Sequence, residues 1–91
     1  MSERIRIRDD RVVWREIEGR VLVLDLDGSR YFATNATGRV LWHALLEGAT
    51  RAELTRRLIE AYDVSEEQAG RDVESFLGEL STRELLVSEA R

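Results

Sequence analysis

The chain has 91 residues, of which 43% are hydrophobic and 35% are charged, and this composition predicts one small globular domain over residues 1–91. Its 14 basic residues, all arginine, and its 18 acidic residues give a formal net charge of -4, which argues against nucleic acid as a ligand. Because the chain has no cysteine, no secretory signal and no membrane-length apolar run, we expect a cytoplasmic protein without disulfides and without membrane association.

Residues 4–33 are rich in β-branched and aromatic residues that alternate with polar ones, which predicts a β-sheet. The predicted strands are Val12–Ile17, Arg20–Leu26 and Ser29–Ala33. Glu18 and Gly19 join the first two strands. Asp27 and Gly28 form a strong hairpin signal, which predicts a two-residue type I′ turn with both residues at positive φ.

The third predicted strand is the outer strand of this meander, because it leads directly into the helices. The tight turn predicts a register in which Leu24 lies opposite Tyr31. The strand contains neither Pro nor Lys, which commonly protect an exposed edge, so its main-chain groups are available to a guest strand. An alternative stays open at this point, in which residues 5–8 or residues 85–87 occupy the same edge.

From residue 35 onward the hydrophobic period changes to 3.6, which predicts three helices. The capping signals are Asn35 for the first helix, Thr50 with Glu53 for the second, and Ser65 with Gln68 for the third. Gly48 is placed to end the first helix at positive φ. The residues predicted to face the core are Thr37, Val40, Leu41, Ala44 and Leu45 in the first helix, Leu54, Leu58, Ile59 and Tyr62 in the second, and Ala69, Val73, Phe76, Leu77 and Leu80 in the third.

A three-stranded antiparallel β-meander followed by three α-helices, with a tight connection at residues 62–65, predicts an α+β fold of the winged helix-turn-helix type. Leu85–Val87 either adds a short final strand or packs across the helices. The fold by itself does not determine the function.

The single histidine, His43, lies between Arg39 and Glu47 on the side of the first helix opposite its apolar stripe. We interpret it as a solvated helix residue, because a catalytic base needs an oriented partner and a pocket. The chain has no Gly-rich phosphate loop and no nucleophile elbow, and one histidine without cysteines does not make a His-rich or thiolate metal site. We therefore expect no metal, no cofactor and no catalytic residue, and the protein is not expected to be an enzyme.

Two alternative functions stay open. A winged-helix DNA-binding regulator would place the third helix in the major groove, but that helix carries five acidic residues against Arg71 alone, which would repel phosphates. A non-catalytic subunit that stabilises an enzyme complex would present an apolar patch, for which Trp14, Trp42 and Leu46 are the candidates. We favour packing of both tryptophans at the edge of the core.

Two stretches of the chain resemble a known family. The first spans Val21 to Tyr62 and contains VLVLDLDGSRYFATNATGRVLW and EGATRAELTRRLIEAY, and the second spans Arg71 to Leu86 and reads RDVESFLGELSTRELL. Their order and spacing resemble PqqD-like domains, which are recognition elements for ribosomally made, modified peptides. The size of the chain, the Tyr-Phe before Asn-Ala-Thr-Gly, and Trp42 are similar to the small stand-alone leader-binding proteins of lasso peptide pathways. Thr34 departs from the Leu that many members have before the Asn.

This resemblance implies a non-catalytic adaptor that binds the leader of a precursor peptide and delivers it to a separate leader peptidase and a cyclase. The leader would add as a strand to the third β-strand and lie against the third helix. The residues that match these positions are Ser29, Arg30, Tyr31, Phe32, Ala33 and Thr34 on the strand, and Arg71, Asp72, Ser75, Phe76 and Glu79 on the helix. Leaders of this type often carry a Tyr-x-x-Pro motif, whose Tyr would need an apolar pocket lined by Phe76.

Overall fold

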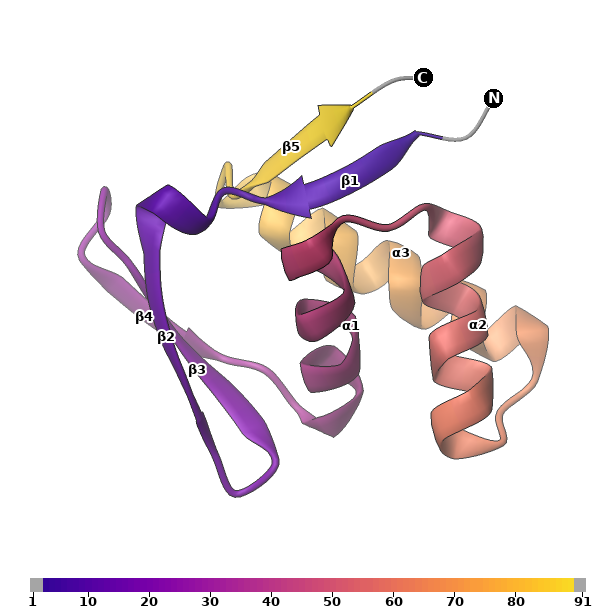
Figure 1. Cartoon of the computed structure of the whole chain (residues 1–91). Helices are drawn as coiled ribbons and strands as arrows, with labels where there is room; N and C mark the ends of the chain where they lie inside the picture. Colours follow the sequence, from indigo (N-terminus) through magenta and orange to yellow (C-terminus); the bar gives the residue numbers. More distant parts are fainter. Residues whose placement is uncertain (1–2, 90–91) are drawn as a thin grey trace.

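A computed structural model describes residues 3–89 and contains one three-stranded antiparallel sheet followed by three helices. The strands of this sheet are β2 (Val12–Ile17), β3 (Arg20–Asp25) and β4 (Arg30–Ala33), and the helices are α1 (Ala36–Glu47), α2 (Arg51–Tyr62) and α3 (Glu66–Thr82). The strand order is β2-β3-β4, and α1 lies between the sheet and the other two helices (Figure 1). The predicted α+β winged helix-turn-helix architecture is therefore confirmed.

The two ends of the described chain form a second, two-stranded ribbon. In it β1 (Arg4–Ile7) pairs antiparallel with β5 (Leu86–Glu89), and a short 3-10 helix, η1 (Asp9–Arg11), leads from β1 into the three-stranded sheet. Neither strand of the ribbon pairs with β4, which has β3 as its single neighbour among the described strands. The alternative in which one of these segments covers the outer edge of the sheet is therefore wrong, and that edge is open.

The register of the hairpin is as predicted, with Leu24 opposite Tyr31, but the predicted type I′ turn is wrong. Neither Asp27 nor Gly28 has a positive φ, whereas Ser29 does, at 51°. The backbone N–H of Asp27 donates to the side chain of Asp25 at 3.1 Å, and this local bond favours a wider turn. As a result β3 ends at Asp25, one residue earlier than predicted, and Ser29 lies outside β4.

The two positive φ angles that a type I′ turn requires occur in the other hairpin. Glu18 and Gly19, between β2 and β3, have φ angles of 54° and 77°. Because this turn is tight, β2 and β3 pair along their whole length, from Val12 opposite Asp25 to Ile17 opposite Arg20.

The core is formed where the inner face of the sheet meets the apolar stripes of the helices. All five predicted core residues of α3 are buried, and Leu41, Ala44 and Leu45 of α1 are buried as well. Trp42 is fully buried and its ring centroid lies 6.2 Å from that of Trp14, while Leu46 packs partly buried against the core. The tryptophans therefore pack at the core, as favoured from the sequence, and do not form an exposed patch.

The helix caps follow the sequence closely, with one exception. Thr50 and Glu53 form the complete capping box of α2. Ser65 accepts a bond from the backbone N–H of Gln68 at 3.1 Å, but the Gln68 side chain bonds to Asp72 and not to the cap, so the predicted box of α3 is only half formed. No helix among residues 3–89 is long and apolar enough to cross a membrane.

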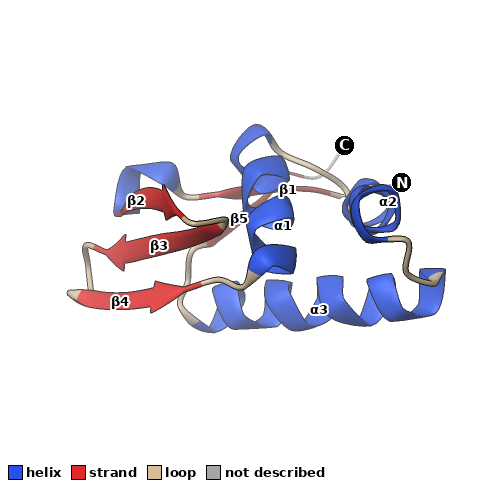
Figure 2. Ribbon diagram, turned by 90° about the horizontal axis from the view of Figure 1, so that it is seen from below, coloured by secondary structure: helices blue, strands red, loops and turns tan. Residues whose placement is uncertain are grey.

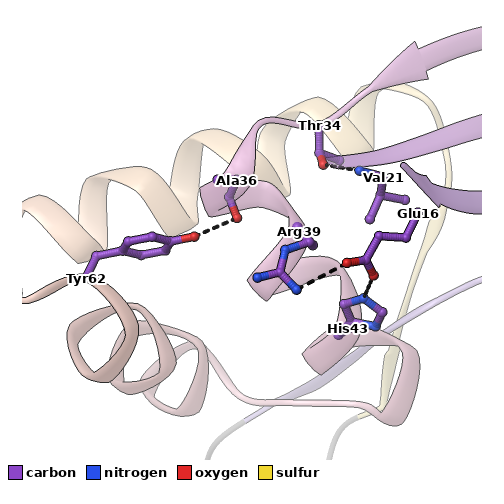
Figure 3. A network of polar contacts seen from close by, with 7 residues as sticks. All are labelled: Glu16, Val21, Thr34, Ala36, Arg39, His43 and Tyr62. Carbon is purple, nitrogen blue, oxygen red and sulfur yellow. Dashed lines mark hydrogen bonds and ion pairs between the residues drawn. The ribbon is translucent and has the colours of Figure 1, made fainter. Parts of the chain in front are cut away.

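One predicted side-chain position is corrected by the structure. Tyr62 is 39% exposed rather than turned into the core, and its hydroxyl donates to the carbonyl of Ala36 at 3.0 Å (Figure 3). His43 is partly exposed, as expected, but it also has a partner that was not predicted: its Nε2 lies 2.8 Å from Oε1 of Glu16, which also pairs with Arg39 (Figure 3). This cluster ties β2 to α1.

Candidate peptide-binding site

The open edge of β4 displays a defined set of main-chain groups. The backbone N–H of Thr34 donates to the carbonyl of Val21 at 2.9 Å, which makes these two residues a hydrogen-bonded pair. In an antiparallel ladder such pairs alternate with non-bonded ones, so Phe32 and Arg30 also direct their main-chain groups toward β3. The N–H and C=O groups of Tyr31 and Ala33 consequently point away from the sheet, toward the open edge.

The open edge of β4 ends at Thr34. This residue is 5% exposed, and its hydroxyl accepts a bond from the backbone N–H of Val21 at 3.1 Å (Figure 3). Its carbonyl accepts a bond from Nε of Arg20 at 3.1 Å. The main-chain and side-chain groups of Thr34 are thus used within the domain. A Thr at this position satisfies the end of the β3–β4 ladder, a role that a Leu side chain has no atoms to fill.

A groove runs beside β4 and separates it from α3. Both elements lie along the same side of the molecule in Figure 2. The groove holds a cavity of about 310 Å³ at the end of β4, where β4, α1 and α3 converge. Its lining residues are Arg20, Phe32, Ala33, Thr34, Asn35, Thr37, Gly38, Leu41, Asp72, Ser75, Phe76 and Glu79.

Aromatic rings form the apolar part of this groove. Phe32 lies on the inner face of β4 and is partly buried, while Phe76 on α3 is 9% exposed and belongs to the core. The guanidinium of Arg83 stacks over the Phe32 ring at 4.1 Å from its centroid, a cation–π contact. These rings give an anchoring side chain a surface to pack against.

The charges along the groove are mixed in sign. Asp72 and Glu79 line the cavity near Phe76, and Arg20 lies at the same end. A second cavity, of about 550 Å³, lies near the start of β4 and is lined by Asp25, Gly28, Arg30, Glu79, Thr82 and Arg83. Each end thus presents both acidic and basic side chains.

Seven of the eleven residues predicted for the site lie together around the first cavity. They are Phe32, Ala33, Thr34, Asp72, Ser75, Phe76 and Glu79. Arg30 lines the second cavity. Ser29 lies in the turn, and the Arg71 side chain pairs with Glu67 and Gln68 on the surface of α3, so neither lines the groove.

Tyr31 occupies a different position from the other strand residues. Its side chain is 70% exposed, on the outer face of the sheet, opposite Leu24. Its contribution to the edge is therefore made by its main chain, because its ring faces away from the groove.

Several groove residues were not predicted, and two of them carry a sequence signal. Arg83 follows Glu79 by four residues and so continues the same face of α3, beyond the point where the predicted set stopped. Gly38 lies inside a helix, where a glycine is unfavourable, but Gly70 and Gly78 of α3 share this signal without being crowded. Arg20 and Leu41 carry no such signal, because their place in the groove follows from the tertiary packing of three elements.

The groove is suited to binding an extended chain. An open strand edge supplies main-chain donors and acceptors, and the neighbouring groove supplies contacts for alternate side chains. Among residues 3–89 no cluster of three or more metal-ligating side chains occurs.

Comparisons with known proteins place the chain in a family. The family model described as coenzyme PQQ synthesis protein D (PqqD) matches residues 20–86. The solved structure of TbiB1 in complex with the TbiA(beta) leader peptide is 32% identical, covers 94% of this chain and 99% of that chain, and has a TM-score of 0.82. The structure of lasso peptide synthetase B1 complexed with the leader peptide is 22% identical, covers 91% of this chain and 96% of that chain, and has a TM-score of 0.78, a likeness in fold. No curated protein matches the chain.

The matched segment includes every element that builds the groove. It begins at Arg20, the first residue of β3, and ends at Leu86, the first residue of β5, so that β4, α1 and α3 all lie within it. The predicted resemblance is thereby confirmed, and the chain belongs to the PqqD family.

Proposed function

We propose that the protein binds the leader region of a ribosomally synthesised precursor peptide, of the lasso class, as a strand added to β4 and packed against α3. The observation that carries this proposal is the open edge of β4, where the main-chain groups of Tyr31 and Ala33 face outward beside a groove that contains the rings of Phe32 and Phe76. The proposal is supported by TbiB1, at 32% identity, whose solved structure contains a leader peptide.

Because side chains alternate between the two faces of a strand, successive leader residues make different contacts with the protein. A leader residue opposite Phe32 directs its side chain to the same face as Phe32, toward α3. Leader residues opposite Tyr31 and Ala33 direct theirs to the outer face of the sheet and exchange main-chain hydrogen bonds with β4. Main-chain pairing therefore contributes affinity for an extended chain, while the groove selects among sequences.

In this proposal the protein is an adaptor and catalyses no reaction itself. A separate leader peptidase and a cyclase act on the precursor that it holds, and residues 1–91 serve as one recognition domain. All contacts assigned to the leader come from one strand and one helix of that domain, which leaves the remainder of its surface for the enzymes.

The test is the titration of a fluorescent leader peptide, taken from a precursor encoded beside this gene, into the protein and two variants of Ala33. Ala33→Pro removes an outward N–H that pairs with no group inside the domain, so the protein should remain folded while leader affinity falls about tenfold or more. Ala33→Val keeps that N–H and a strand-forming side chain, and should bind within about threefold of the wild type.

Circular dichroism establishes that each variant is folded. An unrelated peptide of equal charge controls for non-specific binding, and should not saturate. A folded wild-type protein that does not bind the leader would overturn the proposed function. If Ala33→Pro and Ala33→Val bind equally well, strand addition at this edge is wrong even though the leader binds.

A further inference from the structure

Gly38 is buried in the first turns of α1, and its backbone conformation does not explain why it is a glycine. The glycines with positive φ are Gly19 and Gly48, whereas Gly38 is helical. A glycine inside a helix destabilises it by about 1 kcal/mol relative to alanine. At Gly38 the packing around the residue supplies a reason for the missing side chain.

The reason is steric. A Cβ at Gly38 would lie 2.8 Å from Cβ of Thr34, 3.0 Å from Cε1 of Phe76 and 3.3 Å from Oδ1 of Asn35. The first two separations are shorter than ordinary carbon–carbon contacts, so a side chain would force its neighbours to move. By contrast, a Cβ at Gly70 of α3 would meet no atom within 4 Å.

The neighbours differ in how readily they move. Thr34 is fixed by its bonds to Val21 and by the bond that its carbonyl accepts from Arg20. The ring of Phe76 borders the cavity of about 310 Å³. A methyl group at Gly38 would meet the fixed Cβ of Thr34 first and would crowd the Phe76 ring as well, and a shift of that ring into the cavity would make the cavity shallower.

We propose that Gly38 is a specificity-determining residue, which sets the depth of the pocket that receives one anchoring apolar side chain of the leader. This inference rests on the proposed function. The missing side chain lets the Phe76 ring lie against α1, and the space left beside the ring accepts a leader side chain directed toward α3. Gly38 is thus a positioning residue, which acts through Phe76.

The test measures the affinity of the protein for the leader and for a series of single alanine variants of that leader. In the wild-type protein, one leader position directed toward α3 should show the largest loss of affinity on substitution. In Gly38→Ala, affinity for the unmodified leader should fall about tenfold, and alanine at that anchor position should then cause little further loss. The control Gly70→Ala, on the same domain but in open space, should leave the whole series unchanged.

A second substitution fills the same cavity and changes no core residue. Ser75 is exposed on α3 and lines the cavity, so Ser75→Leu fills it from the solvent side. The affinity of Ser75→Leu for the unmodified leader should also fall about tenfold, and alanine at the same leader position should then cause little further loss. Thermal unfolding followed by circular dichroism identifies any variant that is not folded at the temperature of the titration.

The outcomes separate this inference from the proposed function. If the wild-type protein does not bind the leader, the proposed function fails. If the wild-type protein binds, but the anchor position keeps its full effect in folded Gly38→Ala or in Ser75→Leu, the assignment of Gly38 is wrong. A loss spread evenly over all leader positions would also overturn it, because a merely structural role would weaken every contact alike.

Discussion

Phe76 and Arg30 illustrate how two residues of one groove differ in their expected importance. Phe76 is 9% exposed, contacts the core and lines the cavity near Gly38, whereas Arg30 is exposed at the opposite end of β4. Burial of an apolar surface contributes more to peptide affinity than an exposed charge, which water and salt screen. The larger contribution is therefore expected from the aromatic residue.

We expect Phe76→Leu to weaken leader binding by about five- to tenfold and Arg30→Ala by less than about threefold. Leucine is chosen at position 76 because it keeps most of the core contact and so preserves the fold. Isothermal titration calorimetry on both folded variants measures the two losses. Equal losses, or a larger loss for Arg30→Ala, would contradict the assignment of Phe76 to the pocket.

The polar contacts at the residue scale were the least predictable from the sequence. His43 was expected to be solvated because it lies opposite the apolar stripe of its own helix. Its partner Glu16 belongs to β2, 27 residues away, and the contact exists because the sheet folds back over α1. A pattern within one helix contains no information about a carboxylate supplied by another element.

At the element scale, the helices were predicted well because their signals are local. The capping residues and the core stripe of each helix lie within a few residues of one another, and α3 buries all the residues assigned to its stripe. The prediction of a type I′ turn at Asp27–Gly28 was wrong for one local reason and one of longer range. Asp25 accepts the bond from the backbone N–H of Asp27, and Arg11, from η1, forms an ion pair with the Asp27 side chain.

We expect Thr50→Ala to lower the free energy of unfolding by about 1 kcal/mol, because Thr50 caps α2 and accepts a bond from the N–H of Glu53. Thr55→Ala, in the same helix, removes a hydroxyl that only bonds back to the carbonyl of Arg51 and should not lower stability. Urea unfolding measures both variants. Leader affinity should be unchanged in each, since α2 does not line the groove.

At the scale of the whole molecule, the groove is the part that the sequence determines least directly. The patterns of its two walls predicted β4 and α3 as elements, whereas the place of α3 beside the bound peptide came from the family resemblance. The distance between them, the cavity at their junction and the part of Gly38 in it follow from the packing of α1 between the sheet and α3 (Figure 2). The open edge of β4 also required the structure, since it depends on β1 and β5 pairing with each other.

The charge balance of the molecule predicts a weak dependence of leader binding on salt. The net charge is -4, and each end of the groove carries side chains of both signs. Leader affinity should change less than about threefold between about 50 mM and 500 mM NaCl, whereas a DNA-binding protein would lose orders of magnitude. Fluorescence anisotropy with the leader and with duplex DNA tests this. Saturable DNA binding with a steep salt dependence would support the transcriptional alternative.

The ribbon of β1 and β5 has a consequence for the connectivity of the domain. Arg4 lies opposite Glu89, so the start of β1 and the end of β5 are neighbours. A short linker between them would close the backbone into a ring, and new ends opened at the exposed Glu18–Gly19 turn would break no strand pairing. The arrangement of the elements in space therefore does not depend on their order along the chain. A circularly permuted protein should retain the edge of β4 and its groove.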